Sequence, residues 1–415
     1  MFRFIHAADL HLDSPLVGLS KVEGSPIDII QQATRQALVQ LVDLAIEESV
    51  AFIVLAGDLY DGDWKDYRTG LFFVREMRRL EAAGIHVYLI SGNHDAESKL
   101  TKALSLPANV FSFPTKKAKT LTHPHLPVSL HGQGFATAAV TENLAAEYPA
   151  PVVNHLNIGL LHTNVGDREG HGNYAPSRLP ELVAKGYDYW ALGHIHQRSI
   201  LNEAPAVVYS GNTQGRNVRE TGAKGCYLVE VNEELAIISL SFRPLDSVRW
   251  ENLVIDCEPL TDRVQLLDAV RAGMEAAIER AEGRLVAVRV TLTGASYLHE
   301  SLHSEFQRFE SECLSLVDAL GSDCVWFEKL KVRTTSRIDP VKLAQQDELT
   351  ALVLESLEEF DPSQLPKAVS DLRGKLAQPV LDEVAEQLDA SNSTVREEVR
   401  KDVSAIVLHA ISTSG

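Results

Sequence analysis

The chain has 415 residues, of which 45% are hydrophobic and 23% charged, and its formal net charge is −18. This composition is that of a globular protein and excludes a disordered or fibrous one, while the length predicts more than one domain. No run of about 18 apolar residues, signal peptide or C-x-x-C pair is present, so we expect a cytoplasmic protein with reduced cysteines and no membrane contact. The acidic charge, of which residues 341–415 contribute −7, weakens a nucleic-acid function without excluding it.

Strand-like and helical segments alternate over the first 245 residues. The strand-like runs are FRFIHAA, AFIVLA, IHVYLIS, NIGLL and YDYWAL, and later AVVYSG, GCYLVEV and LAIISLSF. Helices are expected at about 27–48, 66–83 and 178–185, and the second should end at Gly84, a residue typical of helix C-termini. The alternation predicts a mixed α/β (α+β) class, with a two-layered β-sandwich core flanked by helices.

A different pattern follows the core. Residues 248–335 read β-α-β-α-β, with helices expected at about 262–281 and 299–320, and only helical patterns follow Asp339-Pro340. We therefore expect three parts: a core domain at 1–245, a small βαβαβ domain at 246–338 and an all-helical C-terminal region at 339–415.

Five of the strand-like runs end in short blocks rich in histidine and carboxylate. The blocks are Asp9-Leu10-His11, Gly57-Asp58-Leu59-Tyr60-Asp61, Gly92-Asn93-His94-Asp95, Leu161-His162 and Gly193-His194-Ile195-His196. Any one of these histidines is readily explained as a strand-end residue bonded to a backbone carbonyl, and His6 is expected in the core. Five such blocks in order predict a single site, because open α/β sheets bind ligands at the carboxyl ends of their strands.

Mixed oxygen and nitrogen donors of this kind suit two divalent ions that clamp a phosphate and lower the pKa of a bound water. Asp9 and His11 are expected to reach one ion together, because side chains two apart on a strand share a face. Asp58 follows a glycine that permits a tight turn and is expected between the ions. The remaining expected ligands are Asn93, His162 and His194 for the second ion and His196 for the first.

The block Gly92-Asn93-His94-Asp95 also contains the expected catalytic residues. A protonated His94 would stabilise the phosphate or protonate the leaving oxygen. Asp95 is expected to orient His94, and Asp61 is expected to hold one of the ligand histidines.

These motifs resemble those of the calcineurin-like metallophosphoesterase family: D-x-H, G-D-x-x-D, G-N-H-D, a lone H and G-H-x-H. Within the family, the segments ADLHLDSP, AGDLYDGD, SGNHD and ALGHIHQR are most similar to SbcD-type and YhaO-type DNA repair exonucleases. The resemblance implies two divalent ions with manganese preferred, Asp58 bridging, His94 catalytic and DNA ends as substrate. It further implies that 246–338 is a cap domain and that 339–415 docks an SMC-like coiled-coil ATPase, and it leaves a homodimer open.

Other functions remain open beside this metal-dependent DNA exonuclease acting in repair. They are a phosphodiesterase on small nucleotides and a scaffold subunit of an ATPase complex with little activity alone. A protein phosphatase is disfavoured, because such enzymes carry G-N-H-E and an arginine shortly after G-D-x-x-D. Further candidates are Arg178, Arg198, Arg216 and Arg219 for phosphate contacts, His171 and Tyr174 for the substrate groove, Leu71, Phe72 and Val74 for an interface or the core, and Lys116, Lys117 and Lys119 as a solvated basic loop.

Overall fold

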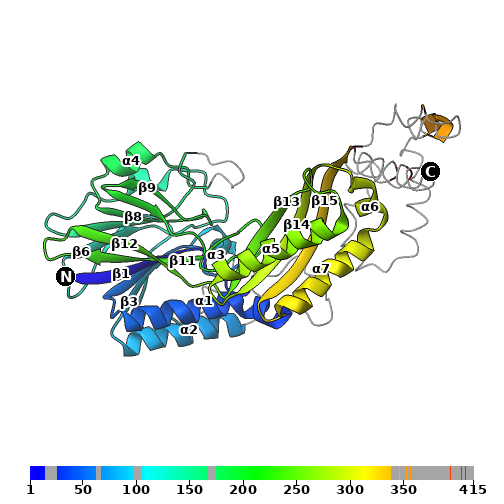
Figure 1. Ribbon diagram of the computed structural model, residues 1–415. Helices are drawn as coiled ribbons and strands as arrows, with labels where there is room; N and C mark the ends of the chain where they lie inside the picture. The colour runs from blue at the N-terminus through cyan, green and yellow to red at the C-terminus, as the bar shows by residue number, and fades with distance from the viewer. Residues whose placement is uncertain are drawn as a thin grey trace. The chain divides into compact units, whose positions relative to one another are not determined.

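The computed structural model describes residues 1–14, 26–61, 67–97, 105–166 and 174–337, with a few positions between 345 and 407. Its contacts divide the chain into two compact units, Met1–Trp250 and Glu251–Gly415, which run from blue to green and from green to red in Figure 1. Within the described parts of the chain, no helix is both long and apolar enough to cross a membrane. Apart from those few positions, the expected helical region at 339–415 lies outside the described residues.

Two six-stranded sheets form the first unit. One has the order β12-β11-β1-β2-β3-β4 and the other β5-β6-β7-β8-β10-β9. The first sheet consists of β1 (Phe2–Ala7), β2 (Phe52–Ala56), β3 (His86–Ile90), β4 (Val110–Ser112), β11 (Gly225–Val231) and β12 (Ile237–Pro244). The second consists of β5 (Lys119–Thr122), β6 (Val128–Gly132), β7 (Leu156–His162), β8 (Tyr189–Gly193), β9 (Ser199–Glu203) and β10 (Ala206–Tyr209).

Apolar side chains from both sheets fill the space between them. Phe4, Val54 and Ile90 of the first sheet pack in one buried cluster with Ile158 and Tyr189 of the second. Strands buried on both faces read as continuous apolar runs, which is why these segments were recognisable. The expected mixed α/β class, with two β-layers flanked by helices, is confirmed.

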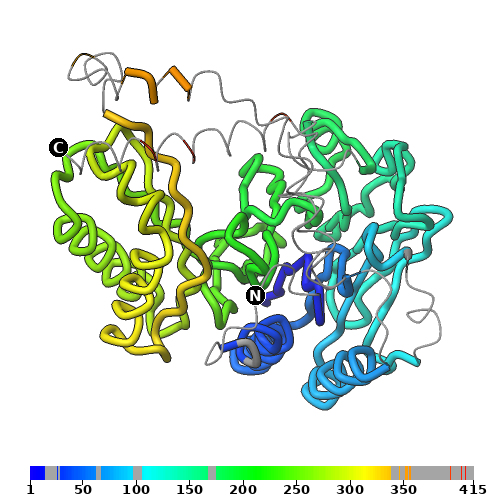
Figure 2. Tube along the Cα trace, turned by 90° about the vertical axis from the view of Figure 1, so that its right-hand side faces the viewer, coloured from blue at the N-terminus to red at the C-terminus, as the bar shows by residue number. Residues whose placement is uncertain are grey.

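Helices cover the outer faces of this sandwich. On the first sheet, α1 (Ile27–Glu47) and α2 (Tyr67–Ala82) run side by side, as the two blue coils at the bottom of Figure 2 show. On the second sheet, η2 (Leu144–Glu147) and α4 (Leu179–Ala184) pack beside Trp190. The expected helices differ from α1, α2 and α4 by no more than about a residue at each end. The largely polar edge strand β9 and the short helix α3 (Asn93–Glu97) were not predicted.

The second unit contains a three-stranded sheet of order β13-β14-β15. Its elements are β13 (Val248–Asp256), α5 (Arg263–Ala281), β14 (Leu285–Ser296), α6 (His299–Ser304), α7 (Phe306–Leu320) and β15 (Val325–Ser336). Helices α5 and α7 pack on one face of the sheet, on the viewer's side in Figure 1. The prediction of a single helix at 299–320 is wrong. The helical backbone is interrupted at Glu305, where φ is −112° and ψ is 28°, so α6 and α7 are separate helices.

The chain passes from the first unit to the second within β13, since the contacts divide after Trp250. The expected domain limits at 245 and 338 remain a proposal.

Candidate metal centre

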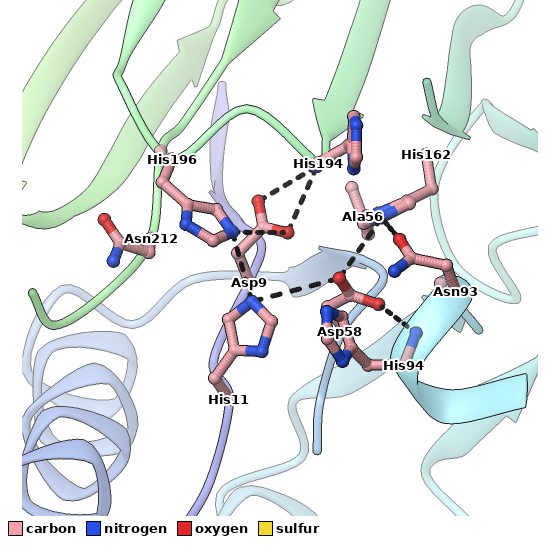
Figure 3. A network of polar contacts seen from close by, with 12 residues as sticks. Asp9, His11, Ala56, Asp58, Asn93, His94, His162, His194, His196 and Asn212 are labelled. Atoms are coloured by element: carbon pink, nitrogen blue, oxygen red, sulfur yellow. Dashed lines mark hydrogen bonds and ion pairs between the residues drawn. The ribbon is translucent and has the colours of Figure 1, made fainter. Parts of the chain in front are cut away.

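The five blocks meet at the carboxyl edge of the two sheets. Asp9 and His11 follow β1, Asp58 follows β2, and Asn93 and His94 follow β3. His162 ends β7, and His194 and His196 follow β8. Figure 3 shows these side chains converging from both sheets. The parallel pairing of β1 with β2, of β2 with β3, and of β7 with β8 places these strand ends together.

The backbone at this edge turns sharply. Asp9, His11 and Asp58 all have positive φ, at 52°, 43° and 51°. Strand β1 ends at Ala7, so Asp9 and His11 reach the site through a turn and not through the strand alternation expected from sequence. Gly57 has φ of 96°, and a Cβ there would lie 2.5 Å from the Nδ1 atom of His162. A glycine is therefore required for this approach.

One group of donors consists of Asp9, His11 and His196. Their donor atoms all lie within 4.8 Å of one another. The Nε2 atoms of the two histidines are 3.1 Å apart, and the Nε2 atom of His196 is 4.0 Å from Oδ1 of Asp9. The Asp9 carboxylate also accepts the backbone N–H of His194, at 3.1 Å to each oxygen.

A second group centres on Asp58, Asn93 and His162. The Nε2 atom of His162 lies 3.3 Å from Oδ2 of Asp58 and 3.0 Å from Oδ1 of Asn93. Its Nδ1 atom lies 2.9 Å from the carbonyl oxygen of Ala56, which fixes the ring with Nε2 toward the oxygen donors. Oδ2 of Asp58 is also 3.8 Å from Nε2 of His11. Asp58 thus lies between the two groups, the position that a bridging ligand requires.

The donor set fits divalent transition ions. Imidazole nitrogen and carboxylate or amide oxygen together suit manganese, iron or zinc, and most of these donors are buried. His194 is not among the grouped donors, although its ring lies edge-on to that of His162, with centroids 5.3 Å apart. His194 therefore remains a proposed ligand, because its ring nitrogens are not grouped with the other donor atoms as those of His11, His162 and His196 are.

Strong electrostatic coupling marks the centre of the site. Burial alone would raise the pKa of Asp58, but the adjacent His162 holds it well below its usual range. Burial lowers the pKa of His162, yet the charges of Asp58 and Asp9 and a hydrogen bond to Asp58 raise it to about 9. The carboxylates of Asp58 and Asp9 therefore stabilise a positive charge beside them. A divalent ion at this position would be stabilised in the same way.

His94 is paired with a different carboxylate from the one expected. Its Nδ1 atom lies 2.9 Å from Oδ1 of Asp61, and this hydrogen bond raises the pKa of His94. The carboxylate of Asp95 instead accepts the backbone N–H groups of Leu59, Tyr60 and Gly92, at 2.9–3.2 Å. Among the described residues, the Asp95 carboxylate therefore braces the turn after β2, and Asp61 is the carboxylate that contacts His94; a catalytic role for either remains a proposal.

Two further residues that contact the site follow the last block. Oε1 of Glu220 lies 2.8 Å from Nδ1 of His196, which leaves the Nε2 atom of that ring toward Asp9 and His11. Arg216 is ion-paired with Glu220 at 2.9 Å and with Asp61 at 3.4 Å. Glu220 was not predicted, and Arg216 was expected to contact phosphate, whereas its guanidinium is already engaged by these carboxylates. The i, i+4 spacing of Arg216 and Glu220 was the only available signal.

The other candidate residues lie in several environments. Tyr174 packs edge-on to His194 with ring centroids 5.4 Å apart, whereas His171 lies outside the described residues. The guanidinium of Arg198 lies 3.8 Å from the ring centroid of Phe242. Arg178, Arg219, Lys116, Lys117 and Lys119 are partly or fully exposed. On α2, Leu71 is exposed, Phe72 is half-buried and Val74 is buried.

Comparison with known proteins agrees with this architecture. The calcineurin-like phosphoesterase family profile matches residues 2–198, and the profile of the middle domain of metallophosphoesterase YhaO matches 250–335. An uncharacterized metallophosphoesterase YhaO of Bacillus subtilis is 36% identical over 82% of this chain and 84% of its own length. The chain belongs to the calcineurin-like metallophosphoesterase family, which consists of hydrolases that use divalent metal ions.

Two more distant relatives have more specific names. The DNA double-strand break repair protein Mre11 of Saccharolobus solfataricus is 26% identical over 65% of this chain and 71% of its own length. The SbcD component of the nuclease SbcCD of Escherichia coli is 23% identical over 72% of this chain and 80% of its own length.

Proposed function

We propose that this protein is a metal-dependent phosphodiesterase that degrades DNA as an exonuclease in repair. The observation that carries the proposal is the position of His94 beside two groups of metal-type donors, with its own carboxylate partner. Its side chain is 38% exposed, whereas those of Asp58 and His162 are at most 2% exposed. A substrate can therefore reach His94 while the donors remain shielded. The names of the Mre11 and SbcD relatives support DNA as the substrate.

Two divalent ions, with manganese preferred, would neutralise the phosphate and activate the attacking water at this site. Asp9, His11 and His196 would hold one ion, and Asn93, His162 and His194 the other, with Asp58 between them. Apart from His194, which is carried over from the sequence motif, this assignment follows the two donor groups and the position of Asp58. The buried carboxylates and oriented imidazoles would keep the ligands in place before substrate arrives.

His94 would supply the proton. Because Asp61 accepts the hydrogen bond from Nδ1–H, the Nε2–H of the protonated ring remains available to a substrate. When the P–O bond breaks, this proton would pass to the leaving oxygen while water adds to phosphorus. Asp61 would stabilise the imidazolium of His94 before the proton is transferred. Arg216, which is ion-paired with both Asp61 and Glu220, would hold the Asp61 carboxylate in place.

A partner subunit is part of the proposal. The relative in Escherichia coli is named as a subunit of a nuclease, which supports a complex here as well. We propose an SMC-like coiled-coil ATPase as the partner, and residues 339–415 as the segment that docks it. The expected amphipathic helices in this segment suit a helix-in-groove contact.

The proposal is tested by hydrolysis of end-labelled linear DNA and of bis-p-nitrophenyl phosphate with manganese. His94→Ala should lower both rates by a factor on the order of 10² or more while two ions still bind. His125→Ala, which changes an exposed histidine outside the site, is the matched control. If the wild type hydrolyses the small diester but not DNA, the metal-dependent phosphodiester chemistry would be supported, and a phosphodiesterase on small nucleotides would be favoured. If the wild type hydrolyses neither substrate, the result would favour a scaffold subunit.

A further inference from the structure

A concentration of positive charge lies in the second unit. Strands β14 and β15 carry four cations, Arg289, Lys329, Lys331 and Arg333, which we call the basic face. Lys329 and Arg333 are exposed, and Lys331 is partly exposed. In a chain of net charge −18, such a group of cations requires an explanation.

The strand register places these four side chains on one face. Arg289 is paired with Lys329 across the two parallel strands, Thr291 with Lys331, and Thr293 with Arg333. Side chains of paired residues point to the same side of a sheet, and alternate residues of a strand share that side. The intervening residues of β14, Val288, Val290 and Leu292, pack in the core with α5 and α7. The basic face is therefore the face opposite these helices.

A β-bulge contributes to this arrangement. The register shifts between Val288 and Arg289, which leaves Glu328 as an additional residue in β15. Bulges change the direction of side chains locally, and here Glu328 forms an ion pair with Arg289 from the same side as Lys329. Glu328 is the counter-ion of Arg289 within the basic face.

Unlike Arg289, the other three cations of the basic face have no counter-ion in the part of the chain that the structure describes. Among the described residues, Lys329, Lys331 and Arg333 take part in no ion pair. Burial, followed by the nearby charges of Arg289, Arg333 and Lys329, lowers the pKa of Lys331, and the charge of Glu328 offsets only part of this effect. This repulsion is unfavourable within the unit itself. An external anion would relieve it.

We propose that the basic face binds the phosphate backbone of a DNA strand, an inference that rests on the proposed nuclease function. Alternate residues of a strand are about 6.6 Å apart, so Lys329, Lys331 and Arg333 form a row about 13 Å long. This spacing is comparable with the distance between successive phosphates of one nucleic-acid strand, so the three side chains can contact successive phosphates. A linear row of this kind suits a regular polyanion better than a single small anion. It also supplies local positive charge in a strongly acidic chain.

The test measures binding without cleavage. Fluorescence anisotropy of a labelled single strand of about 20 nucleotides, and of the corresponding duplex, is recorded in EDTA at several sodium chloride concentrations. The neutralised variant is Lys329→Gln, Lys331→Gln and Arg333→Gln in one chain. Its matched control is Arg271→Gln, Arg280→Gln and Arg308→Gln, which removes three charges from α5 and α7. Hydrolysis of bis-p-nitrophenyl phosphate with manganese is measured for all three proteins.

The neutralised variant should bind the single strand at least about tenfold more weakly at about 0.1 M salt, and its log–log salt slope should be smaller by about 2. The control should resemble the wild type. A single Arg333→Gln variant, at an exposed position, should lower the slope by about 0.7 and guards against misfolding of the triple variant. Equal slopes for wild type and the neutralised variant would overturn the proposal, as would absence of DNA binding by the wild type. If either of these results is accompanied by hydrolysis of the small diester, the basic-face proposal fails while the proposed phosphodiesterase activity is retained.

Discussion

The Nε2 atoms of His11 and His196 face each other at 3.1 Å, although the residues are 185 positions apart. Glu220 engages the opposite nitrogen of His196, and Asp61 lies 3.6 Å from the opposite nitrogen of His11. Burial, followed by the charge of Arg216, lowers the pKa of His11 to about 4, so this ring is neutral near pH 7. Either a proton on one of the two nitrogens or a cation held by both can stabilise this contact. A divalent ion at this position would be held by both rings.

His11→Ala should remove one of two ions. The variant loses a donor of the group that contains Asp9 and His196, whereas the group around Asn93 and His162 keeps its donors. Titration calorimetry with manganese should show a stoichiometry that falls from two to one. His125→Ala should keep two ions. Two tightly bound ions in His11→Ala would show that His11 is not a ligand.

Glu220→Ala should weaken binding of the ion at His196. Without the carboxylate, the ring is free to rotate and to exchange tautomers, and loss of such a partner typically lowers metal affinity by about 10–100-fold. Glu220→Gln retains an acceptor for Nδ1–H and should show a smaller loss. Exposed Glu234→Gln is the control for charge alone. Calorimetry gives the affinities, and unchanged affinity in Glu220→Ala would exclude this role.

Asp61 and Asp95 should respond differently to substitution. Asp61→Asn removes the charge beside His94 and should lower kcat for bis-p-nitrophenyl phosphate by a factor on the order of 10². Asp95→Asn should instead lower the free energy of unfolding by about 1–3 kcal/mol, because backbone N–H groups of the turn lose an acceptor. Urea unfolding and kinetics of both variants separate the two roles. An equal fall in kcat with no loss of stability in Asp95→Asn would restore its catalytic role.

His6 should make stability depend on pH. Burial lowers the pKa of His6 to about 3 in the folded chain, whereas an unfolded histidine has a pKa of about 6.5. Between these values the unfolded state binds more protons, so stability falls as the pH falls from about 6.5 toward 3. Between about pH 6.5 and 4, wild type should lose about 3 kcal/mol more than His6→Gln. Urea unfolding at several pH values measures the difference, and exposed His125→Gln should retain the wild-type dependence. Parallel curves for wild type and His6→Gln would contradict the prediction.

Local sequence determined most of the secondary structure and the chemistry of the site. Apolar runs such as Phe52–Ala56 are recognisable because a strand buried on both faces has few polar residues. Polar residues directly after such runs indicated a common edge, because the carboxyl ends of parallel strands meet there. The mixed donors in turn indicated divalent ions. These inferences needed only neighbouring residues and one general rule of sheet topology.

Tertiary structure alone decided which of these side chains touch. Asp61 and Asp95 are equally good candidates as partner of His94 in sequence, and only the positions of the turns after β2 and β3 assign Asp61. Glu220 reaches His196 across 24 residues, with no strand-end pattern to reveal it. The basic face likewise depends on the pairing and bulge of β14 and β15. Such contacts follow from register and chain reversal, which depend on the packing of the whole unit, whereas secondary structure depends largely on local side-chain pattern.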